Sequence, residues 1–363
     1  MKLVADIKLC PNEEQSKILC ETLKLANKAC NYISEKAWQT KKFRQFDLHK
    51  ICYADVRERF SLTAQTAVRC IGKVADAYKL DKKTMRQFRE YAAQPYDARI
   101  FRFCNSGQTI NIWTIAGRIE IPFVCGAQQR EMLKRQKGEV DLVYRKQTRQ
   151  WFLCCTVDVE ENPIQETNEF LGIDLGVVNI AVDSTGEKFS GRAVDAKREW
   201  YARRKARLQP VGTKAAKRRL RKLSGRQKRF QSWTNHNISK HLVSKAKCNG
   251  CGIALEDLKG IRERIKARKS QKAKLHNWSF FKLRQYFEYK AKLAGVRIVY
   301  VDPRNTSRTC PDCGHCAKEN RKTQNVFTCV VCGHSSNADY VGAINIARAA
   351  VNQPNVLESR VQA

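Results

Sequence analysis

The spacing of apolar residues in the first eighty positions is typical of helices. Asn12, followed by two acidic residues, favours a helix start, because negative charge stabilises a helix N-terminus. Apolar side chains then recur at steps of three and four, which places them on one face of a long helix: Leu19, Leu23, Ala26, Cys30, Ile33 and Ala37. Two further helical patterns cover 47–60 and 63–80. We therefore predict a small helical unit over 10–80.

The pattern changes to that of β-strands after residue 100. β-branched and aromatic residues gather in short runs separated by Asn, Gly or charged turns, at 100–104, 110–113, 118–123, 140–144 and 151–159. These runs predict a small antiparallel barrel or sheet. The apolar run at 2–9 could join it as a further strand. In that case the helical unit is an insertion into a β domain formed by 1–9 and 81–165.

A third region, from about residue 166, has the pattern of an α/β domain. Its first segment, FLGIDLGVVNIAVD, contains two apolar strand-like runs hinged at Gly176. The patterns that follow are a helical stretch at 197–247, the strand GIALEDL, a basic segment at 259–274, a helix at 279–293, the strand VRIVYVD and a final helix. Helices alternating with apolar strands indicate a sheet covered by helices.

The charge of the chain indicates a class of binding partner. The 363 residues contain 69 Lys and Arg against 35 Asp and Glu, which gives a formal net charge of +34. Such an excess favours a polyanion as partner, and nucleic acid is the first expectation. No apolar run reaches the roughly 18 residues of a spanning helix, and the start of the chain does not resemble a signal peptide. We expect a cytoplasmic protein without a membrane partner.

Two cysteine pairs near the end of the chain have the spacing of a zinc ribbon. Each pair is a CxxC, and fifteen residues separate the pairs, which consist of Cys310, Cys313, Cys329 and Cys332. Each CxxC forms a tight turn that points two sulfurs at one ion, so we predict one structural zinc ion. Two disulfides are the alternative, which a reducing cytoplasm disfavours. His315, Cys316 and His334 lie near enough to be other ligands, whereas a third CxxC at 248–251 has no matching pair nearby.

Three acidic residues stand in apolar surroundings, where an unpaired charge is costly. Asp174 interrupts the strand FLGIDLGVV, Glu256 interrupts GIALEDL, and Asp339 opens the apolar C-terminal helix. If they converge, their oxygens could bind two divalent cations about 4 Å apart, an arrangement that supports phosphodiester cleavage. A helix-cap Asp, a strand-end Glu and a surface Asp are the alternative, and the spacing alone does not decide between them.

The stretch 197–247 is too rich in one charge to be a self-stabilising helix, because like charges at i, i+4 repel. A nucleic-acid backbone would relieve that repulsion, and a solvated helix is the alternative. We predict phosphate contacts from six basic residues: Arg203, Arg204, Lys205, Arg218, Arg219 and Arg221. Four aromatic residues interleave with these charges and could stack on bases or pack on the protein, namely Trp200, Tyr201, Phe230 and Trp233.

The order of these motifs resembles one known family. FLGIDLGVVNIAVD, ALEDLKGIRERI, TSRTCPDCGH with its second CxxC, and NADYVGAINIA are similar, in that order, to the split RuvC-like nuclease domain with inserted zinc ribbon of TnpB proteins. TnpB is an RNA-guided nuclease encoded by insertion-sequence transposons and related to type V CRISPR effectors. HNWSFFKLRQYFEYKAKLAGV also looks like the TnpB helix before the ribbon, and the motifs together cover about 168–348.

The resemblance implies a multidomain α+β protein. It would have an RNase H-like (RuvC) α/β nuclease domain with an inserted zinc ribbon, and an N-terminal β-barrel wedge domain with an inserted helical recognition lobe. The implied boundaries are 1–9 and 81–165 for the wedge domain, 10–80 for the lobe, 166–304 and 336–352 for the RuvC-like domain, 305–335 for the ribbon and 353–363 for a C-terminal tail.

The resemblance also implies which residues act. The family's three catalytic acids match Asp174 on the first strand, Glu256 on a later strand and Asp339 on the last helix. Asp257 should point to the opposite face of the strand from Glu256 and has no such role. Residues 340–342, Tyr-Val-Gly, depart from the Asn and Ala of many relatives, a difference that bears on the packing of this helix.

The implied activity is RNA-guided cleavage of double-stranded DNA beside a short adjacent motif, with two Mg²⁺ ions at the acids and one structural Zn²⁺. The implied partners are a guide RNA encoded by the transposon and a target DNA duplex, with no small-molecule substrate and one protein monomer per RNA. Gln65, Thr66 and Arg69, on the helix at 63–80, are the predicted motif-reading residues. The alternatives are a compact type V CRISPR effector and a non-cleaving RNA-guided DNA-binding repressor.

Overall fold

The computed structural model describes residues 1–104, 108–258, 280–323 and 325–352. The chain divides into two units, the first covering Met1–Val159 and the second beginning at Glu160. The predicted basic segment at 259–274 and the predicted tail at 353–363 lie outside the described residues. Among the helices that are described, none has both the length and the apolar character needed to cross a membrane.

The helical part of the first unit begins at the predicted cap. Asn12 Oδ1 accepts a hydrogen bond from the Gln15 backbone N–H at 2.8 Å, and Gln15 Oε1 accepts one from the Asn12 N–H at 3.1 Å, so two free donors of the first turn are satisfied. Three helices follow, α1 (Glu13–Thr40), α2 (Gln45–Phe60) and α3 (Ala64–Leu80), close to the predicted ranges. Their apolar faces form one buried core.

The opening strand joins the sheet of the first unit, as predicted. β1 (Lys2–Leu9) lies between β7 and β5 and is antiparallel to both. The sheet order is β2-β6-β7-β1-β5-β4-β3, with β2 (Gln94–Tyr96), β3 (Phe101–Phe103), β4 (Thr109–Thr114), β5 (Gly117–Val124), β6 (Gln136–Arg145) and β7 (Gln150–Asp158). The short helix α4 (Ala127–Leu133) follows β5. The helices α1 to α3 thus stand between the first two strands in the chain, and closure of the sheet into a barrel stays a prediction.

The second unit is built on a sheet of mixed direction. Its order is β10-β9-β8-β11-β12, with β8 (Phe170–Asp174), β9 (Asn179–Asp183), β10 (Lys188–Ser190), β11 (Gly252–Glu256) and β12 (Ile298–Val301). β8, β11 and β12 are parallel to one another, and β9 is antiparallel to β8. The two runs of FLGIDLGVVNIAVD are therefore neighbouring strands, as their apolar pattern predicted.

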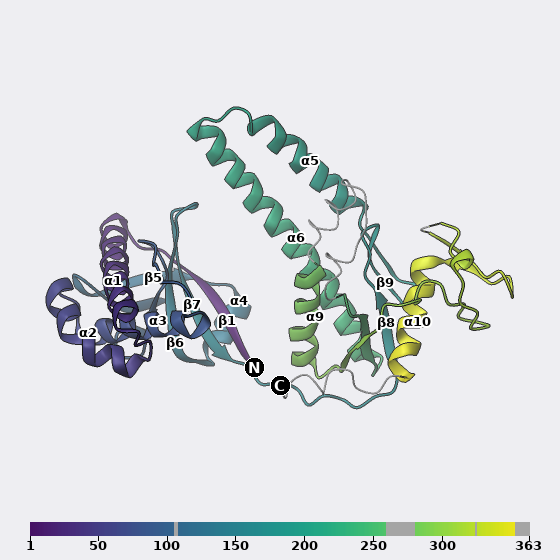
Figure 1. The fold of residues 1–363 in the computed structure, drawn as a ribbon, viewed down its shortest axis with the longest axis horizontal. Helices are drawn as coiled ribbons and strands as arrows, with labels where there is room; N and C mark the ends of the chain where they lie inside the picture. Colours follow the sequence, from purple (N-terminus) through teal and green to yellow (C-terminus); the bar gives the residue numbers. More distant parts are fainter. Residues whose placement is uncertain (105–107, 259–279, 324, 353–363) are drawn as a thin grey trace. The chain divides into compact units, whose positions relative to one another are not determined.

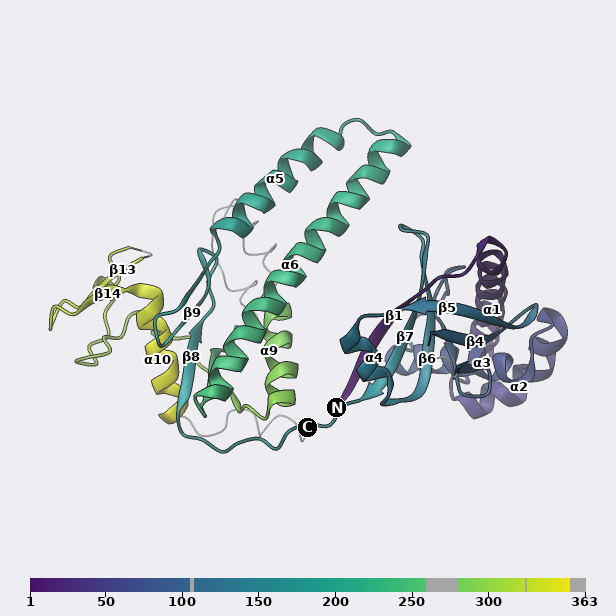
Figure 2. The ribbon, with the colours of Figure 1, turned by 180° about the vertical axis from the view of Figure 1, so that it is seen from behind.

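Helices cover both faces of this sheet (Figures 1 and 2). Alternate side chains of β8 and β11 pack against α6 (Lys214–Cys248) and α9 (Phe280–Ala294) on one face. On the other face Ala254 packs against α10 (Ala338–Asn352). Gly172 lets α10 approach β8 closely, because a Cβ at that position would lie 2.0 Å from the carbonyl oxygen of Ala343.

The predicted helical stretch at 197–247 is two helices. α5 (Arg192–Leu208) and α6 form an antiparallel pair (Figure 1), and the chain between them contains Pro210 and Gly212. Gly212 has a φ of 66°, a left-handed conformation that interrupts a helix. The ribbon segment after β12 contains the short helix η1 (Lys318–Asn320) and a hairpin of β13 (Val326–Thr328) and β14 (Ser335–Asn337).

Candidate metal centres and nucleic-acid interface

Asp174 and Glu256 end neighbouring strands on the same face of the sheet. Ile173 and Leu255, which are register partners in the parallel ladder, both pack toward α6 and α9. Side chains alternate along a strand, so the next residue of each strand points to the face that α10 covers. The two predicted catalytic carboxylates therefore lie side by side at the carboxyl ends of β8 and β11.

Asp339 reaches the same place from the first turn of α10. A Cβ on Gly342, one turn further along this helix, would lie only 3.1 Å from Asp174 Oδ2, so the start of α10 rests against that carboxylate. The glycine that departs from the family pattern thus leaves space for Asp174. All three acids converge at one end of the sheet, from three elements that are far apart in the sequence.

Three further side chains hold these carboxylates. Asn179, at the start of β9, donates from Nδ2 to Asp339 Oδ2 at 2.8 Å. Thr306 Oγ1 donates to Glu256 Oε1 at 2.6 Å. Arg321, from the ribbon segment, places Nη2 3.7 Å from Asp339 Oδ1. Asn179 and Thr306 lie within the quoted motifs FLGIDLGVVNIAVD and TSRTCPDCGH, and Arg321 lies between the two CxxC pairs, but the sequence did not indicate that any of them contacts an acid.

The electrostatics of the site favour a protonated Asp174 unless cations are present. Burial, and then the neighbouring charges of Glu256 and Asp339, raise the pKa of Asp174 to about 8. Burial also raises the pKa of Glu256, although the Thr306 hydrogen bond and the charge of Arg321 act in the opposite direction. Crowded acids of this kind are typical of functional sites, because a bound cation removes the repulsion.

The donors at this site suit hard divalent cations. Carboxylate oxygens are the ligands that Mg²⁺ prefers, and a two-ion site needs donors spread around ions about 4 Å apart. Within the described part of the chain, only four cysteines bring three or more potential ligand atoms within 4.8 Å of one another, so the three carboxylates are spaced more widely than that. Asp257, the neighbour of Glu256, contacts Arg284 on α9 at 2.8 Å and is not part of the group.

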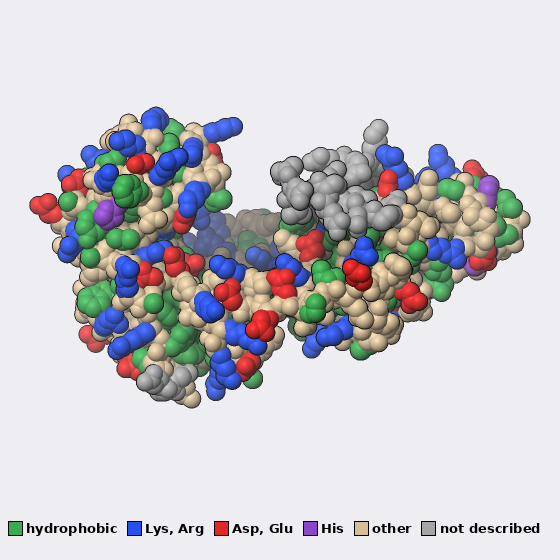
Figure 3. Space-filling view, turned by 90° about the horizontal axis from the view of Figure 1, so that it is seen from below, with side chains coloured by type: hydrophobic (Ala, Val, Ile, Leu, Met, Phe, Trp, Pro, Cys, Tyr) green, Lys and Arg blue, Asp and Glu red, His purple; other side chains and the backbone are tan. Residues whose placement is uncertain are grey.

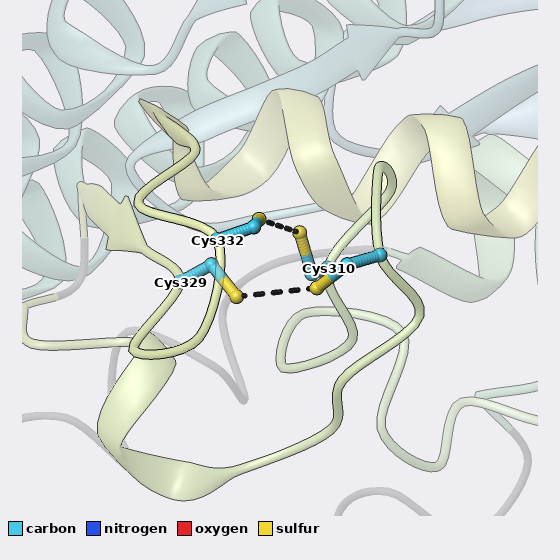
Figure 4. Close-up of side chains that lie close together, drawn as sticks. Cys310, Cys329 and Cys332 are labelled. Carbon is cyan, nitrogen blue, oxygen red and sulfur yellow. Dashed lines mark hydrogen bonds between the residues drawn. The ribbon is translucent and has the colours of Figure 1, made fainter.

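The four ribbon cysteines form the second centre (Figure 4). The sulfurs of Cys310 and Cys332 lie 3.5 Å apart, as do those of Cys313 and Cys329, and all four lie within 4.8 Å of one another. Four thiolates at about 2.3 Å from one tetrahedral zinc ion would have sulfurs about 3.8 Å apart, so the set fits zinc. Backbone N–H groups of Cys332 and Val331 lower the pKa of Cys329 to about 6, which favours its thiolate.

Each cysteine pair is followed by a glycine that the turn requires. Gly314 and Gly333 both have a φ of 75°, and their N–H groups donate to the carbonyl oxygens of Cys310 and Cys329 at 3.1 Å. The alternative ligands His315, Cys316 and His334 are not part of this cluster of described residues. His334 contacts Asp312 at 2.6 Å. Cys316 and the CxxC at 248–251 belong to no such group among the described residues.

The predicted motif-reading residues on α3 have partners within the first unit. The Gln65 side chain donates to Asp97 and accepts from Arg99. Thr66 is buried, and its hydroxyl is 2.8 Å from that of Thr63. Arg69 contacts Glu139, and its guanidinium lies 4.0 Å from Asp97. Their role in reading DNA stays a prediction, and a bound duplex would have to compete with these contacts.

The predicted phosphate contacts on α5 and α6 are presented to solvent. Five of the six are exposed, and Lys205 is half-buried with its Nζ 2.6 Å from Gln227 Oε1. On the face drawn in Figure 3, Lys and Arg side chains are scattered over both units with acidic side chains between them. α6 differs, because its 35 residues include no Asp or Glu.

Comparisons with known proteins agree with the motifs. Residues 152–277 match the family model described as a probable transposase (OrfB of IS605), and residues 280–346 match that of the Cas12f1-like TNB domain. The chain is 32% identical over 230 residues to the CRISPR-associated endodeoxyribonuclease Cas12f1 of Sulfoacidibacillus thermotolerans, covering 58% of this chain and 53% of that one. It is 38% identical over 128 residues to a TnpB-like protein of Methanocaldococcus jannaschii, covering 35% of this chain and 45% of that one.

The fold has a counterpart among solved structures. A Cas12f1 chain, solved by cryo-EM in a complex with sgRNA and target DNA, matches with a TM-score of 0.61 over 93% of this chain and 83% of its own, at 18% identity. This likeness shows a shared mixed α/β multidomain fold. The chain spans about half the length of the curated relatives named above. The comparisons confirm the predicted resemblance, because the chain is similar to proteins named TnpB-like and Cas12f1.

Proposed function

We propose that the protein is an RNA-guided endonuclease that cuts double-stranded DNA by metal-dependent hydrolysis. One observation carries the proposal, which is that Asp174, Glu256 and Asp339 converge from β8, β11 and α10 at one end of the sheet. This arrangement favours bound cations, because three carboxylates held together without cations destabilise one another. The relatives named as endodeoxyribonuclease and TnpB-like protein support the same reaction class.

The three acids would hold two Mg²⁺ ions, which supply a Lewis acid for the scissile phosphate and lower the pKa of a water molecule. The protein's own residues fix the donors. Thr306 holds one oxygen of Glu256, and Asn179 and Arg321 restrain Asp339. Asp174 would give up its proton when cations bind, because their charge would offset the burial and the neighbouring charges of Glu256 and Asp339 that raise its pKa.

The four ribbon cysteines would hold one structural Zn²⁺. All four protein ligands are thiolates, so the tetrahedral site is closed and takes no part in the chemistry. Its effect on the reaction would be indirect. The ribbon segment supplies Arg321, and an ordered ribbon keeps that guanidinium near Asp339.

The partners follow from charge and from the comparisons. A net charge of +34 suits a guide RNA paired with target DNA, and the proposed guide is encoded by the transposon. The proposed complex contains one protein monomer in the cytoplasm, close to the nucleoid. Base pairing would read the target, while Gln65, Thr66 and Arg69 read the short adjacent motif and basic residues of α5 and α6 hold phosphates.

A second candidate is a compact type V CRISPR effector, because Cas12f1 is among the relatives and the TNB domain model matches. The genomic neighbourhood separates the two, since a repeat array favours an effector and a transposon end favours a TnpB. A non-cleaving repressor is less well supported, because all three acids are present and brought together.

The test is cleavage of a matched duplex by the protein purified with its own RNA from its native locus. Wild type should cut with Mg²⁺, and Asp174→Ala should bind the duplex without cutting it. Asp257→Asn is the matched control, because it removes a neighbouring carboxylate that contacts Arg284 instead of the three acids, and it should still cut. Tight binding by wild type without cutting in Mg²⁺ or Mn²⁺ would show that the repressor reading is right.

A further inference from the structure

A groove lies between α5 and α6, away from the three acids. Its volume is about 490 Å³, within the range of about 300–1,000 Å³ of small-molecule sites. Eight residues line it, of which five are cationic and three are apolar: Trp200, Arg204, Ala215, Arg218, Arg219, Lys222, Leu223 and Arg226. Such a lining combines a positive field with an apolar surface.

The positive charge of the groove has no compensation within the described residues. None of its five cations lies within 4 Å of a described carboxylate, and α6 contains no acidic residue. The two acids of α5 are Asp195, which contacts Arg198, and Glu199. Repulsion among the five cations therefore favours an anion in the groove.

The spacing of the cations fits a chain of phosphates better than a single one. Arg218, Lys222 and Arg226 recur at every fourth position of α6, so they form a row with steps of about 6 Å along the helix. A lone phosphate would use only part of this row. A polyanion that runs along the helix can contact each member in turn.

The apolar residues of the groove form a wall that favours one kind of polyanion over another. Trp200 is 37% exposed, and the Arg204 guanidinium lies 4.4 Å from the centre of its ring, so a planar stacking surface already exists there. Leu223 and Ala215 complete the apolar part of the groove. A run of Asp and Glu has no aromatic ring for this wall, whereas an unpaired base stacks on aromatic and guanidinium faces.

We propose that the groove between α5 and α6 binds a single-stranded polynucleotide, with one unpaired base against Trp200 and successive phosphates along Arg218, Lys222 and Arg226. This inference deepens the proposed function by naming where an unpaired strand is held. Single-stranded RNA and single-stranded DNA share the recognising chemistry, and the experiment separates them.

The test measures binding of fluorescein-labelled oligo(U) and oligo(dT) to the purified full-length chain by anisotropy, in EDTA so that cleavage plays no part. Replacing Arg218, Lys222 and Arg226 together by Gln should weaken binding at least about tenfold and reduce the salt slope by about two, because each phosphate contact contributes roughly 0.7 to that slope. The matched control replaces Lys228, Lys240 and Lys247 by Gln, which removes the same charge from exposed positions of the same helix outside the groove. The control should weaken binding less than about threefold.

Trp200→Ala should weaken binding about tenfold with an unchanged salt slope, and Trp200→Phe should keep most of the affinity because it keeps a stacking face. The oligonucleotide with the larger loss identifies the strand. Equal losses for the two triple variants, or wild-type binding by Trp200→Ala, overturn the inference. Asp174→Ala should keep this oligonucleotide binding. If wild type cuts DNA but the groove variants bind oligonucleotides as wild type does, only the proposed strand-binding groove is refuted. If the groove variants lose binding as expected but wild type never cuts DNA, only the proposed nuclease activity is refuted.

Discussion

Asp339 is held by two residues that belong to different parts of the chain. Asn179 donates to one of its oxygens from β9, and Arg321 approaches the other from the ribbon segment. Both contacts join residues that are distant in sequence, so no local pattern could have indicated them. The three acids were different, because the family motifs implied that they act together. Residues that hold a ligand are visible in a motif, whereas those that orient it depend on the folded chain.

Asn179→Ala should raise the Mg²⁺ concentration needed for half-maximal cutting by about tenfold, because residues that orient a metal ligand typically affect metal affinity by ten- to a hundredfold. Cleavage is measured over a Mg²⁺ titration, and duplex binding is measured in parallel. Asn179→Gln, which keeps the amide, should need less Mg²⁺ for half-maximal cutting than Asn179→Ala. An unchanged Mg²⁺ dependence in Asn179→Ala would show that the hydrogen bond has no role in metal binding.

Asp174 also links stability to pH. Its pKa is about 8 in the folded protein against 3.8 for the unfolded chain, so between these values the folded state keeps a proton that the unfolded state has lost. The free energy of unfolding therefore falls as pH rises through this window, and it levels off above about pH 8. Asp174→Asn cannot ionise. Without divalent cations, its melting temperature should exceed that of wild type by a margin that grows by at least about 2 °C from pH 5 to pH 8. A margin that is constant with pH, measured by thermal unfolding in EDTA, would contradict the raised pKa.

Among the elements, strands with a continuous apolar run were predicted, and some short elements were not. β8, β9 and β11 carry clear apolar patterns and lie where expected. β2 has three residues with a Pro at its centre, and α4 has only seven residues, capped by one hydrogen bond from the Gly126 N–H to Gln129 Oε1. Neither gives a periodic signal, because each is formed by packing on the sheet rather than by its own pattern. Pro210 and Gly212 lie at the interruption between α5 and α6. The dense basic residues on both sides of them led to the prediction of one helical stretch.

The contact of α10 with β8 sets the distance between Asp339 and Asp174. Gly172→Ala should lower the free energy of unfolding of the second unit by at least about 2 kcal/mol, because its Cβ would overlap the Ala343 carbonyl oxygen and force α10 outward. Gly225→Ala on α6 is the matched control. There the new Cβ meets only the end of the Arg229 side chain at 3.5 Å, so the change should be neutral or stabilise by up to about 1 kcal/mol. Calorimetry of both variants checks the difference, and equal melting temperatures would mean that α10 adjusts freely.

At the scale of the whole molecule, each of the two units contains an inserted segment. The helices α1 to α3 stand between β1 and β2, and the ribbon stands between β12 and α10. The change of apolar period predicted the first insertion, and the resemblance to TnpB proteins implied the second. The ribbon's contribution of Arg321 to the acid site could not be predicted, because it depends on how the folded ribbon lies against α10. The ribbon is therefore a structural insertion that also completes the candidate active site.

Zinc should stabilise the second unit and leave the first unchanged, since all four cysteines lie beyond Glu160 and the two units have separate cores. Metal ligation contributes directly to folding because the four cysteines come together only in the folded chain, so a chelator should lower one calorimetric transition and leave the other in place. Cys313→Ser should lose the zinc, whereas Cys316→Ser, a nearby cysteine outside the cluster, should keep one zinc per chain by atomic emission. Because Arg321 is carried by the ribbon, the Cys313→Ser protein should also cut more slowly at a given Mg²⁺ concentration. Full zinc content in Cys313→Ser, or loss of both transitions together on chelation, would contradict this separation of the two units.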